Sequence, residues 1–295
     1  MVYFADLNDG FYNSLRFLNK YYGITRNPIT GDFILVMKYY KLGNLKNYIT
    51  KNFYNIKWNE KLIILKSIIG ALSHLHNQKI IHRDFHSGNI LYENDFDIVI
   101  SDLGISKSSL DNNDGKIYGI LPYMAPEILQ GIEYTIASDI YGFGMIMWEF
   151  TTGIPPFNDR EHDFYLALSI CKGERPEIIE NTPQCYIDLM KKCWDQDPSK
   201  RPTALEIIYH LNDDEKFKND VIEFEKTNDI LEQRQKSSLI TSKIINNKST
   251  TKYHPQADYT SCMFDFISEL NETLGLHEGI QNVEELDDAI SNMNI

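Results

Sequence analysis

Three short groups of residues could do chemistry. The first runs from His82 to Asn89 and reads HRDFHSGN. The second is Asp102-Leu103-Gly104, and the third is Ala125-Pro126-Glu127. Carboxylate and amide oxygens are the ligands that Mg²⁺ takes, but a single loop aspartate more often belongs to a turn. Only the three groups together, in this order, indicate a catalytic site.

In this order the groups resemble the protein kinase superfamily, whose catalytic loop reads H-R-D-x-x-x-x-N, whose metal loop reads D-F-G and whose activation segment ends in A-P-E. Four fixed positions match by chance at about 1 in 160,000 starting points, or roughly 0.2% over a chain of this length. The resemblance extends from Tyr21 to Leu211. It implies an α+β, protein-kinase-like fold, with a mainly helical C-lobe and a remnant of the β-rich N-lobe.

The resemblance also implies roles for the loop residues. Phosphoryl transfer needs an oriented hydroxyl, metal ions on the phosphates and neutralised charge. Asp84 would orient the substrate hydroxyl or accept its proton. Asn89 and Asp102 would ligate the Mg²⁺ ions that hold ATP. Arg83 could bind a phosphate on the activation segment, and His86 stands where serine/threonine kinases usually carry lysine.

A hinge for adenine follows the second β-rich run. By resemblance Met37 is the gatekeeper, and Lys38, Tyr39 and Tyr40 follow it. Kinases bind adenine there through backbone groups, so the side chains matter little. The alternative is an ordinary edge strand. We expect Met37, Lys38 and Tyr40 to line the ATP site.

Further residues match supports of the kinase fold. Glu127 would form a buried ion pair with Arg201, and Asp139 would accept hydrogen bonds from the catalytic-loop backbone. His82 and Leu103 would join an apolar column through the core. The candidate phosphorylation sites on the activation segment are Ser106, Ser108, Ser109 and Tyr118.

Apolar periodicity predicts the elements that position these loops. The β-rich runs Tyr21–Thr25 and Phe33–Met37 flank a turn-rich connection and predict a hairpin. The run Trp58–His76 has one apolar face, with Asn59 as its expected N-cap, and Ala137–Thr151 predicts a buried helix. The other expected elements are helices at Leu45–Thr50, Asp163–Cys171, Pro183–Trp194 and Thr203–Leu211, and strands at Ile90–Tyr92 and Ile98–Ile100.

The resemblance and the composition together divide the chain into three parts. Residues 1–40 would be the remnant of the N-lobe with the hinge, and residues 41–212 the kinase C-lobe. Residues 213–295 hold 17 acidic and 8 basic residues, a net charge of −9, and predict an acidic, partly disordered tail. Within this tail we expect a charged helix at 220–235, a flexible linker at 235–259, and short amphipathic helices at 262–276 and 283–293.

The chain departs from the kinase pattern before Met37. The 36 residues that precede it contain no G-x-G-x-x-G, only Lys20 as a lysine, and no glutamate. A complete kinase uses a glycine-rich loop, a strand lysine and a helix glutamate to hold ATP. We therefore expect the first half of the small lobe to be missing from this chain. Because one lost charge costs about 10²–10³ in rate, we expect weak or undetectable activity for the chain alone.

The leading hypothesis is a protein kinase that uses ATP and Mg²⁺ to phosphorylate protein serine or threonine, with tyrosine still possible. Residues typical of tyrosine-kinase-like enzymes favour serine or threonine: Asn44, Cys193-Trp194, Asp197-Pro198 and Arg201-Pro202-Thr203. The alternatives are an inactive pseudokinase that acts as an interaction scaffold, and a truncated gene product. Exposed apolar surface where the small lobe should pack would favour truncation.

The resemblance implies protein and ATP as partners, and composition argues against other classes of partner. The net charge of −13 argues against nucleic acid, because phosphate contacts need a basic surface. No run of 18 apolar residues predicts a membrane span, and no targeting signal is visible, so we expect a cytoplasmic protein. The four cysteines show no metal-binding spacing. The sequence contains no pattern that indicates the oligomeric state, the upstream regulator or the identity of the substrate.

Overall fold

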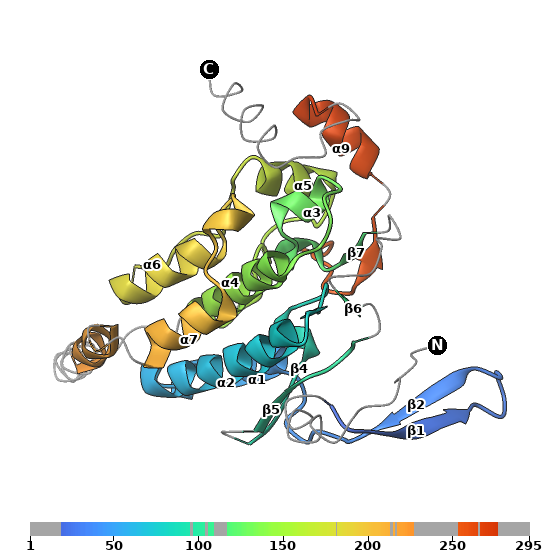
Figure 1. The fold of residues 1–295 in the computed structure, drawn as a ribbon, viewed down its shortest axis with the longest axis horizontal. Coiled ribbons are helices and arrows are strands. Elements are labelled where there is room, and N and C mark those ends of the chain that lie inside the picture. Colours follow the sequence, from blue (N-terminus) through green and yellow to red (C-terminus); the bar gives the residue numbers. More distant parts are fainter. Residues whose placement is uncertain are drawn as a thin grey trace, which may run out of the picture.

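A computed structural model describes residues 19–94, 97–103, 106–108, 117–180, 182–212, 215, 217–226, 253–264 and 266–276. Within these residues, a β-hairpin projects from a lobe made mainly of helices (Figure 1). The predicted α+β architecture, a helical lobe with a small β-rich part, is confirmed. The described helices include none with the length and apolar character of a transmembrane segment.

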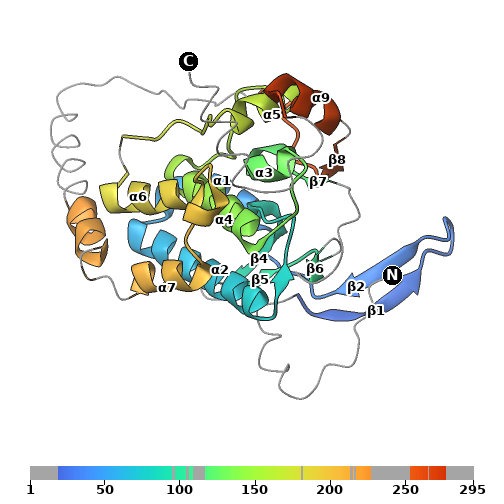
Figure 2. The same cartoon turned by 45° about the horizontal axis from the view of Figure 1, so that its top comes forward.

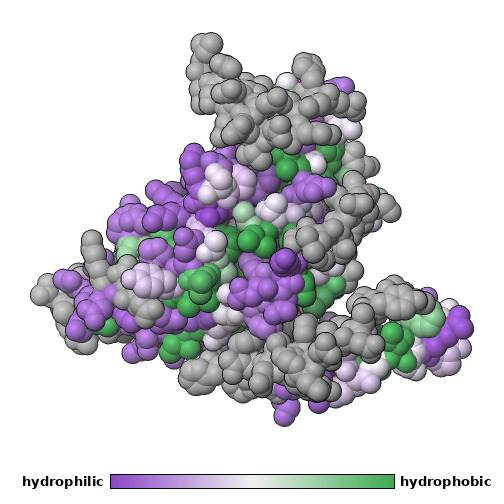
Figure 3. Space-filling model, viewed as in Figure 1, coloured by the Kyte–Doolittle hydropathy of each residue, from purple (hydrophilic) through white to green (hydrophobic). Residues whose placement is uncertain are grey.

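The hairpin consists of β1 (Tyr21–Arg26) and β2 (Phe33–Met37), which pair antiparallel as predicted. Its turn is closed by Asn27, whose side-chain oxygen accepts the amide of Ile29 at 2.9 Å. All five residues of β2 are exposed, and apolar side chains lie on the hairpin surface (Figure 3). Because a two-stranded sheet without a packed face is only marginally stable, little of this apolar surface contributes to stability.

The lobe is organised around α4 (Ile136–Thr152), in which residues 138–151 are all buried. It packs on α6 (Gln184–Cys193), while α2 (Trp58–Asn77) packs on α7 (Ala204–Asn212). The lobe also contains α1 (Leu45–Asn52), α3 (Pro126–Leu129) and α5 (Phe164–Cys171). Every helix predicted between residues 45 and 212 is found, with each end within two residues of its expected place.

One predicted helix cap is wrong. Asn59 lies inside α2, and Lys57 is the N-cap residue. The amide of Lys57 donates to Oε2 of Glu60 at 3.0 Å. The carboxylate at the third helical position therefore fixes the start of the helix at Trp58.

Short strands bring the chemical loops together. The two strands predicted here are found as β4 (Ile90–Asn94) and β5 (Asp97–Ile100). They pair antiparallel, so the residue before β4 lies beside the residue after β5. β3 (Ile80–Ile81) pairs with β6 (Lys107–Ser108). The catalytic loop lies between β3 and β4 and the metal loop follows β5, so both loops meet at one edge.

Part of the tail lies on the lobe. β8 (Cys262–Met263) pairs with β7 (Tyr118–Gly119), and α9 (Ile267–Leu274) lies against α5 (Figure 2). The helix predicted over 262–276 is therefore wrong in its first turn, which is a strand.

Several predictions for the tail fall partly outside the described residues. Residues 253–259, expected in a linker, hydrogen-bond to residues 156–162, so this end of the predicted linker is ordered against the lobe. The chain is helical at 217–226, so the helix predicted over 220–235 begins earlier. Residues 227–252 and the helix predicted at 283–293 lie outside the described residues.

Candidate active site

The catalytic loop is anchored by Asp139, in the first turn of α4. Its Oδ2 accepts the amide of His82 at 2.8 Å, and its Oδ1 accepts the amide of Arg83 at 3.0 Å. His76 of α2 adds a third contact, with Nε2 at 3.0 Å from Oδ2. The predicted contact between Asp139 and the loop backbone is confirmed. These bonds hold Arg83 at a φ of 72°, a left-handed conformation that side chains rarely adopt.

Asp84 is buried at the centre of the loop, and donors surround its carboxylate. Nδ2 of Asn89 donates to the Asp84 carbonyl at 3.0 Å and to Oδ2 at 3.2 Å. Ser261, from the tail, donates its hydroxyl to the same Oδ2 at 2.5 Å. Burial alone would raise the pKa of Asp84, but the neighbouring His86, with help from Ser261 and His82, holds the pKa below its ordinary value. Asp84 is therefore a carboxylate at neutral pH.

Two histidines flank this aspartate, and in both rings Nδ1 accepts a backbone amide, so the hydrogen is on Nε2. Nδ1 of His86 accepts the amide of Gly88 at 3.0 Å, so the neutral ring carries its hydrogen on Nε2. That nitrogen lies 3.4 Å from Oδ2 of Asp84, too poorly directed for a strong hydrogen bond. Nδ1 of His82 accepts the amide of Asp84 at 3.3 Å, and Nε2 donates to the Ser101 carbonyl at 3.1 Å. Burial lowers the pKa of His82, so it is a neutral structural residue.

The metal loop is tied to the catalytic loop through Ser101. Its amide and its hydroxyl both donate to the carbonyl of Asn89, at 2.8 and 2.9 Å. The next residue, Asp102, is exposed and has a φ of 59°. Tyr21 of the hairpin lies close enough to Asp102 that burial and then the Asp102 charge raise the pKa of the Tyr21 phenol. Leu103 packs against the core, as the resemblance implied.

The donors at this edge suit magnesium. The Asn89 amide turns its nitrogen toward Asp84, so its oxygen is the atom that can face a cation. Asp102 supplies a carboxylate from the adjoining loop. In the part of the chain that the structure describes, no three His, Cys, Asp or Glu side chains form a metal cluster. Mg²⁺ tolerates such a sparse set, because it binds through one or two carboxylates, phosphates and retained water.

The hinge residues continue from β2 into the lobe. Met37 is half-exposed, and its sulfur accepts Nδ2 of Asn19 at 2.9 Å. The amide of Lys38 donates to the Lys20 carbonyl at 2.8 Å, and Nζ of Lys38 lies 5.0 Å from the centre of the Tyr40 ring. Tyr40 is buried. A role in adenine binding stays a prediction for Met37, Lys38 and Tyr40.

The activation segment ends in two buried polar clusters. The predicted pair of Glu127 and Arg201 is confirmed, with nitrogen–oxygen distances of 2.6 and 2.7 Å. The second cluster was not predicted. Glu149 of α4 accepts the hydroxyls of Tyr123 at 2.7 Å and Ser87 at 2.8 Å. Burial raises the pKa of Glu149 to about 8. The sequence signal that could have indicated this cluster was Glu149, an acidic residue within the apolar run that predicted α4.

The environment of Arg83 is aromatic. Its guanidinium lies 4.4 Å from the centre of the Tyr134 ring, and the Tyr134 hydroxyl donates to the Tyr118 carbonyl at 2.7 Å. Ser106 donates its hydroxyl to the His82 carbonyl at 3.1 Å. Ser109 lies outside the described residues. Phosphate binding by Arg83 stays a prediction.

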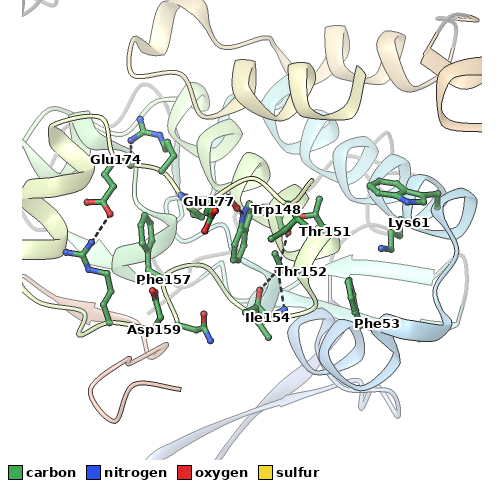
Figure 4. Close-up of a pocket in the computed structure, with 16 residues that line it drawn as sticks. Phe53, Lys61, Trp148, Thr151, Thr152, Ile154, Phe157, Asp159, Glu174 and Glu177 are labelled. Carbon is green, nitrogen blue, oxygen red and sulfur yellow. Dashed lines mark hydrogen bonds and ion pairs between the residues drawn. The ribbon is translucent and has the colours of Figure 1, made fainter. Parts of the chain in front are cut away.

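A hollow of about 700 Å³ lies away from these loops (Figure 4). It is formed by the start of α2, the end of α4 and residues 174–179. Nζ of Lys61 lies 4.6 Å from the ring centre of Phe53 and 4.8 Å from that of Trp58. Burial, partly opposed by Glu225, lowers the pKa of Lys61 to about 8. No residue of the catalytic or metal loop lines this hollow.

Comparison with known proteins agrees with this geometry. The family model for "Protein tyrosine and serine/threonine kinase" matches residues 14–211. A probable serine/threonine-protein kinase of Dictyostelium discoideum, roco8, is 34% identical over 194 residues. The putative serine/threonine-protein kinase/receptor R831 of Acanthamoeba polyphaga mimivirus is 34% identical over 183 residues. Each match covers 61% of this chain but only 10% or 11% of the relative.

Proposed function

We propose, since this chain belongs to the protein tyrosine and serine/threonine kinase family, that its loops transfer the γ-phosphoryl group of ATP to a serine or threonine hydroxyl of a protein. One observation carries the proposal. Asp84 is a buried carboxylate, held by Asn89, and it accepts the hydroxyl of a serine at 2.5 Å. This is the contact that an acceptor serine must make before it attacks a phosphorus atom.

Each loop residue has a defined task in this reaction. The acceptor oxygen attacks the γ-phosphorus, the bond from that phosphorus to the β–γ bridging oxygen breaks, and ADP leaves with the electron pair. Asp84 takes the hydroxyl proton on Oδ2. Nε2 of His86 lies 3.4 Å from the same oxygen, and His86 stands where other kinases place a lysine. Asn89 and Asp102 would hold Mg²⁺, which neutralises phosphate charge when bound.

On the nucleotide side, the hinge would hold adenine through the backbone of residues 38–40, with Met37 beside it. Protein substrate and ATP are then the two partners. The names of the similar proteins favour serine or threonine over tyrosine as the acceptor. The chain spans about a tenth of the length of these relatives. Any activity, substrate or partner of a whole protein is therefore also a proposal.

Nucleotide binding is the first test. A thermal-shift measurement with Mg·ATP on the full chain should show stabilisation, which Asp102→Ala should remove. Asp188→Ala is the matched control, because Asp188 is an exposed carboxylate on α6. Transfer to a serine-containing peptide should fall about 10²–10⁴-fold in Asp84→Asn. A folded chain with neither binding nor transfer would instead support the pseudokinase scaffold.

A further inference from the structure

The tail segment 253–258 lies against the lobe and turns at residues 255–256. The amide of His254 donates to the Asn158 carbonyl at 2.8 Å, and the amide of His162 donates to the Gln256 carbonyl at 3.2 Å. Nδ1 of His162 lies 2.6 Å from the Asp258 carbonyl. These bonds join two segments that are almost a hundred residues apart in the sequence. Residues 253–258 therefore have a specific place on the lobe.

Tyr259 anchors the next part of the tail. Its hydroxyl donates to the Pro156 carbonyl at 2.9 Å, and its ring meets His162 edge to face at 4.7 Å. Nζ of Lys46, from α1, lies 5.3 Å from the ring centre. Burial raises the pKa of the Tyr259 phenol. A large side chain with three different contacts fixes the chain two residues before Ser261.

Beyond Ser261 the tail becomes a strand on the activation segment. In the pairing of β8 with β7, Cys262 lies opposite Gly119 and Met263 lies opposite Tyr118. The amide of Phe264 then donates to the Ile117 carbonyl at 3.1 Å. This antiparallel register begins directly after Ser261 and so sets its position beside the catalytic loop.

A helix completes the attachment. Phe266 meets Phe164 of α5 edge to face at 5.9 Å, and Leu270 of α9 is fully buried. Nδ2 of Asn271 donates to the Gln130 carbonyl at 3.0 Å. The tail is thus held on both sides of Ser261, by Tyr259 before it and by β8 and α9 after it.

Between these anchors, the Ser261 hydroxyl donates to Oδ2 of Asp84 at 2.5 Å, while the rest of the residue is exposed. Thr260 lies in a bend, and its amide donates to Oδ1 of Asp258 at 2.9 Å. Ser268 lies in α9. Only Ser261, among these hydroxyl residues, is placed at the catalytic carboxylate.

We propose that residues 253–276 are a built-in substrate of this active site and that Ser261 is phosphorylated in cis. This inference rests on the proposed kinase function. The Ser261 oxygen forms the new bond to the γ-phosphorus of ATP, its proton passes to Asp84, and ADP leaves with the electrons of the broken bridging bond. Because correct orientation gives effective concentrations of about 10⁵–10⁸ M, a slow site still completes one transfer per chain.

The product should leave the site. A phosphoserine carries a charge of about −1.5 to −2 at neutral pH, and it would lie against the Asp84 carboxylate. Repulsion between the two anions should unpair β8 from β7 and free the acceptor position. The modification would therefore open the site to other protein substrates.

The test is to incubate the full chain with Mg·ATP and to locate phosphate by tandem mass spectrometry. We expect one phosphate on Ser261, first-order kinetics and no change in rate on tenfold dilution. Ser261→Ala should lose this phosphate, and the matched variant Thr260→Ala should keep it. A rate that falls in proportion to protein concentration would overturn transfer in cis.

A serine-containing peptide, added to both the unmodified chain and Ser261→Ala, separates the two proposals. If the peptide is phosphorylated and Ser261 is not, the kinase function stands and this inference is wrong. If neither is phosphorylated, both are wrong.

Amide hydrogen exchange then tests the released state. The Phe264 amide should exchange at least tenfold faster in the phosphorylated chain than in the unmodified chain. Equal exchange rates would show that phosphorylation does not open the site.

Discussion

Replacing Arg201 by alanine should lower the free energy of unfolding by about 3–5 kcal/mol, because the buried Glu127 carboxylate then lacks its partner. The Arg201 side chain is fully enclosed, at 0% exposure. Its two terminal nitrogens donate to the two Glu127 oxygens at 2.6 and 2.7 Å. It also donates to the carbonyls of Ala137 at 3.0 Å and Asp195 at 2.8 Å, which would both lose a donor.

Equilibrium unfolding in urea at pH 7 measures this loss, with Arg160→Ala as the matched control. Arg160 pairs with Glu174 at 2.9 Å, but the two side chains are 34% and 46% exposed, so its loss should cost less than about 1 kcal/mol. For a domain of this size, Arg201→Ala should lower Tm by about 6–20 °C. Equal losses in the two variants would refute the reasoning. Combining Arg201→Met with Glu127→Leu should recover most of the stability, because no charge is then buried unpaired.

Two further variants probe α4. A Cβ at Gly142 would lie 2.3 Å from the Phe85 carbonyl oxygen, so Gly142→Ala should displace the catalytic loop and abolish any phosphoryl transfer. Gly70→Ala, in α2 with nothing within 4 Å of the new methyl group, should instead stabilise the fold by about 0.5–1 kcal/mol, which urea unfolding would detect. Burial raises the folded pKa of Glu149 to about 8, above its unfolded value of about 4.5, so its stabilising effect is complete below pH 4.5 and is lost as pH rises to 8. Glu149→Gln should remove the part of the decline in the free energy of unfolding between pH 5 and 8 that comes from Glu149. Parallel pH profiles of this free energy for the variant and the unmodified protein would contradict the assignment of the decline to Glu149.

The sequence was informative wherever a pattern was local. The apolar character of residues 137–151 predicted α4 to within one residue at each end. Asp139, Glu127 and Arg201 were assigned by resemblance, and their contacts have the expected geometry. The family resemblance named these partners, although Glu127 and Arg201 are 74 positions apart.

The sequence was uninformative where contacts join distant segments and the family resemblance names no partner. Ser261 and Asp84 are 177 positions apart, and the polar residues around Ser261 predicted a linker and then a helix. Strand β8 has only two residues, and it exists because β7 offers a partner. Glu149 looked like one polar residue in an apolar helix, and only the fold shows that it accepts two hydroxyls. Such features depend on tertiary contacts, which override local propensity.

The contacts of α4 explain why Asp84 is positioned before any nucleotide binds. Asp139 holds the amides of residues 82 and 83, Gly142 touches the carbonyl of residue 85, and Glu149 holds the hydroxyl of residue 87. The catalytic loop thus runs along the helix in the same order as its three supports. Asp139 and Glu149 are ten positions apart, which is about 15 Å along a helix. Because this helix is buried and the hairpin is exposed, damage to α4 should lower kcat, whereas damage to the hairpin should raise KM for ATP.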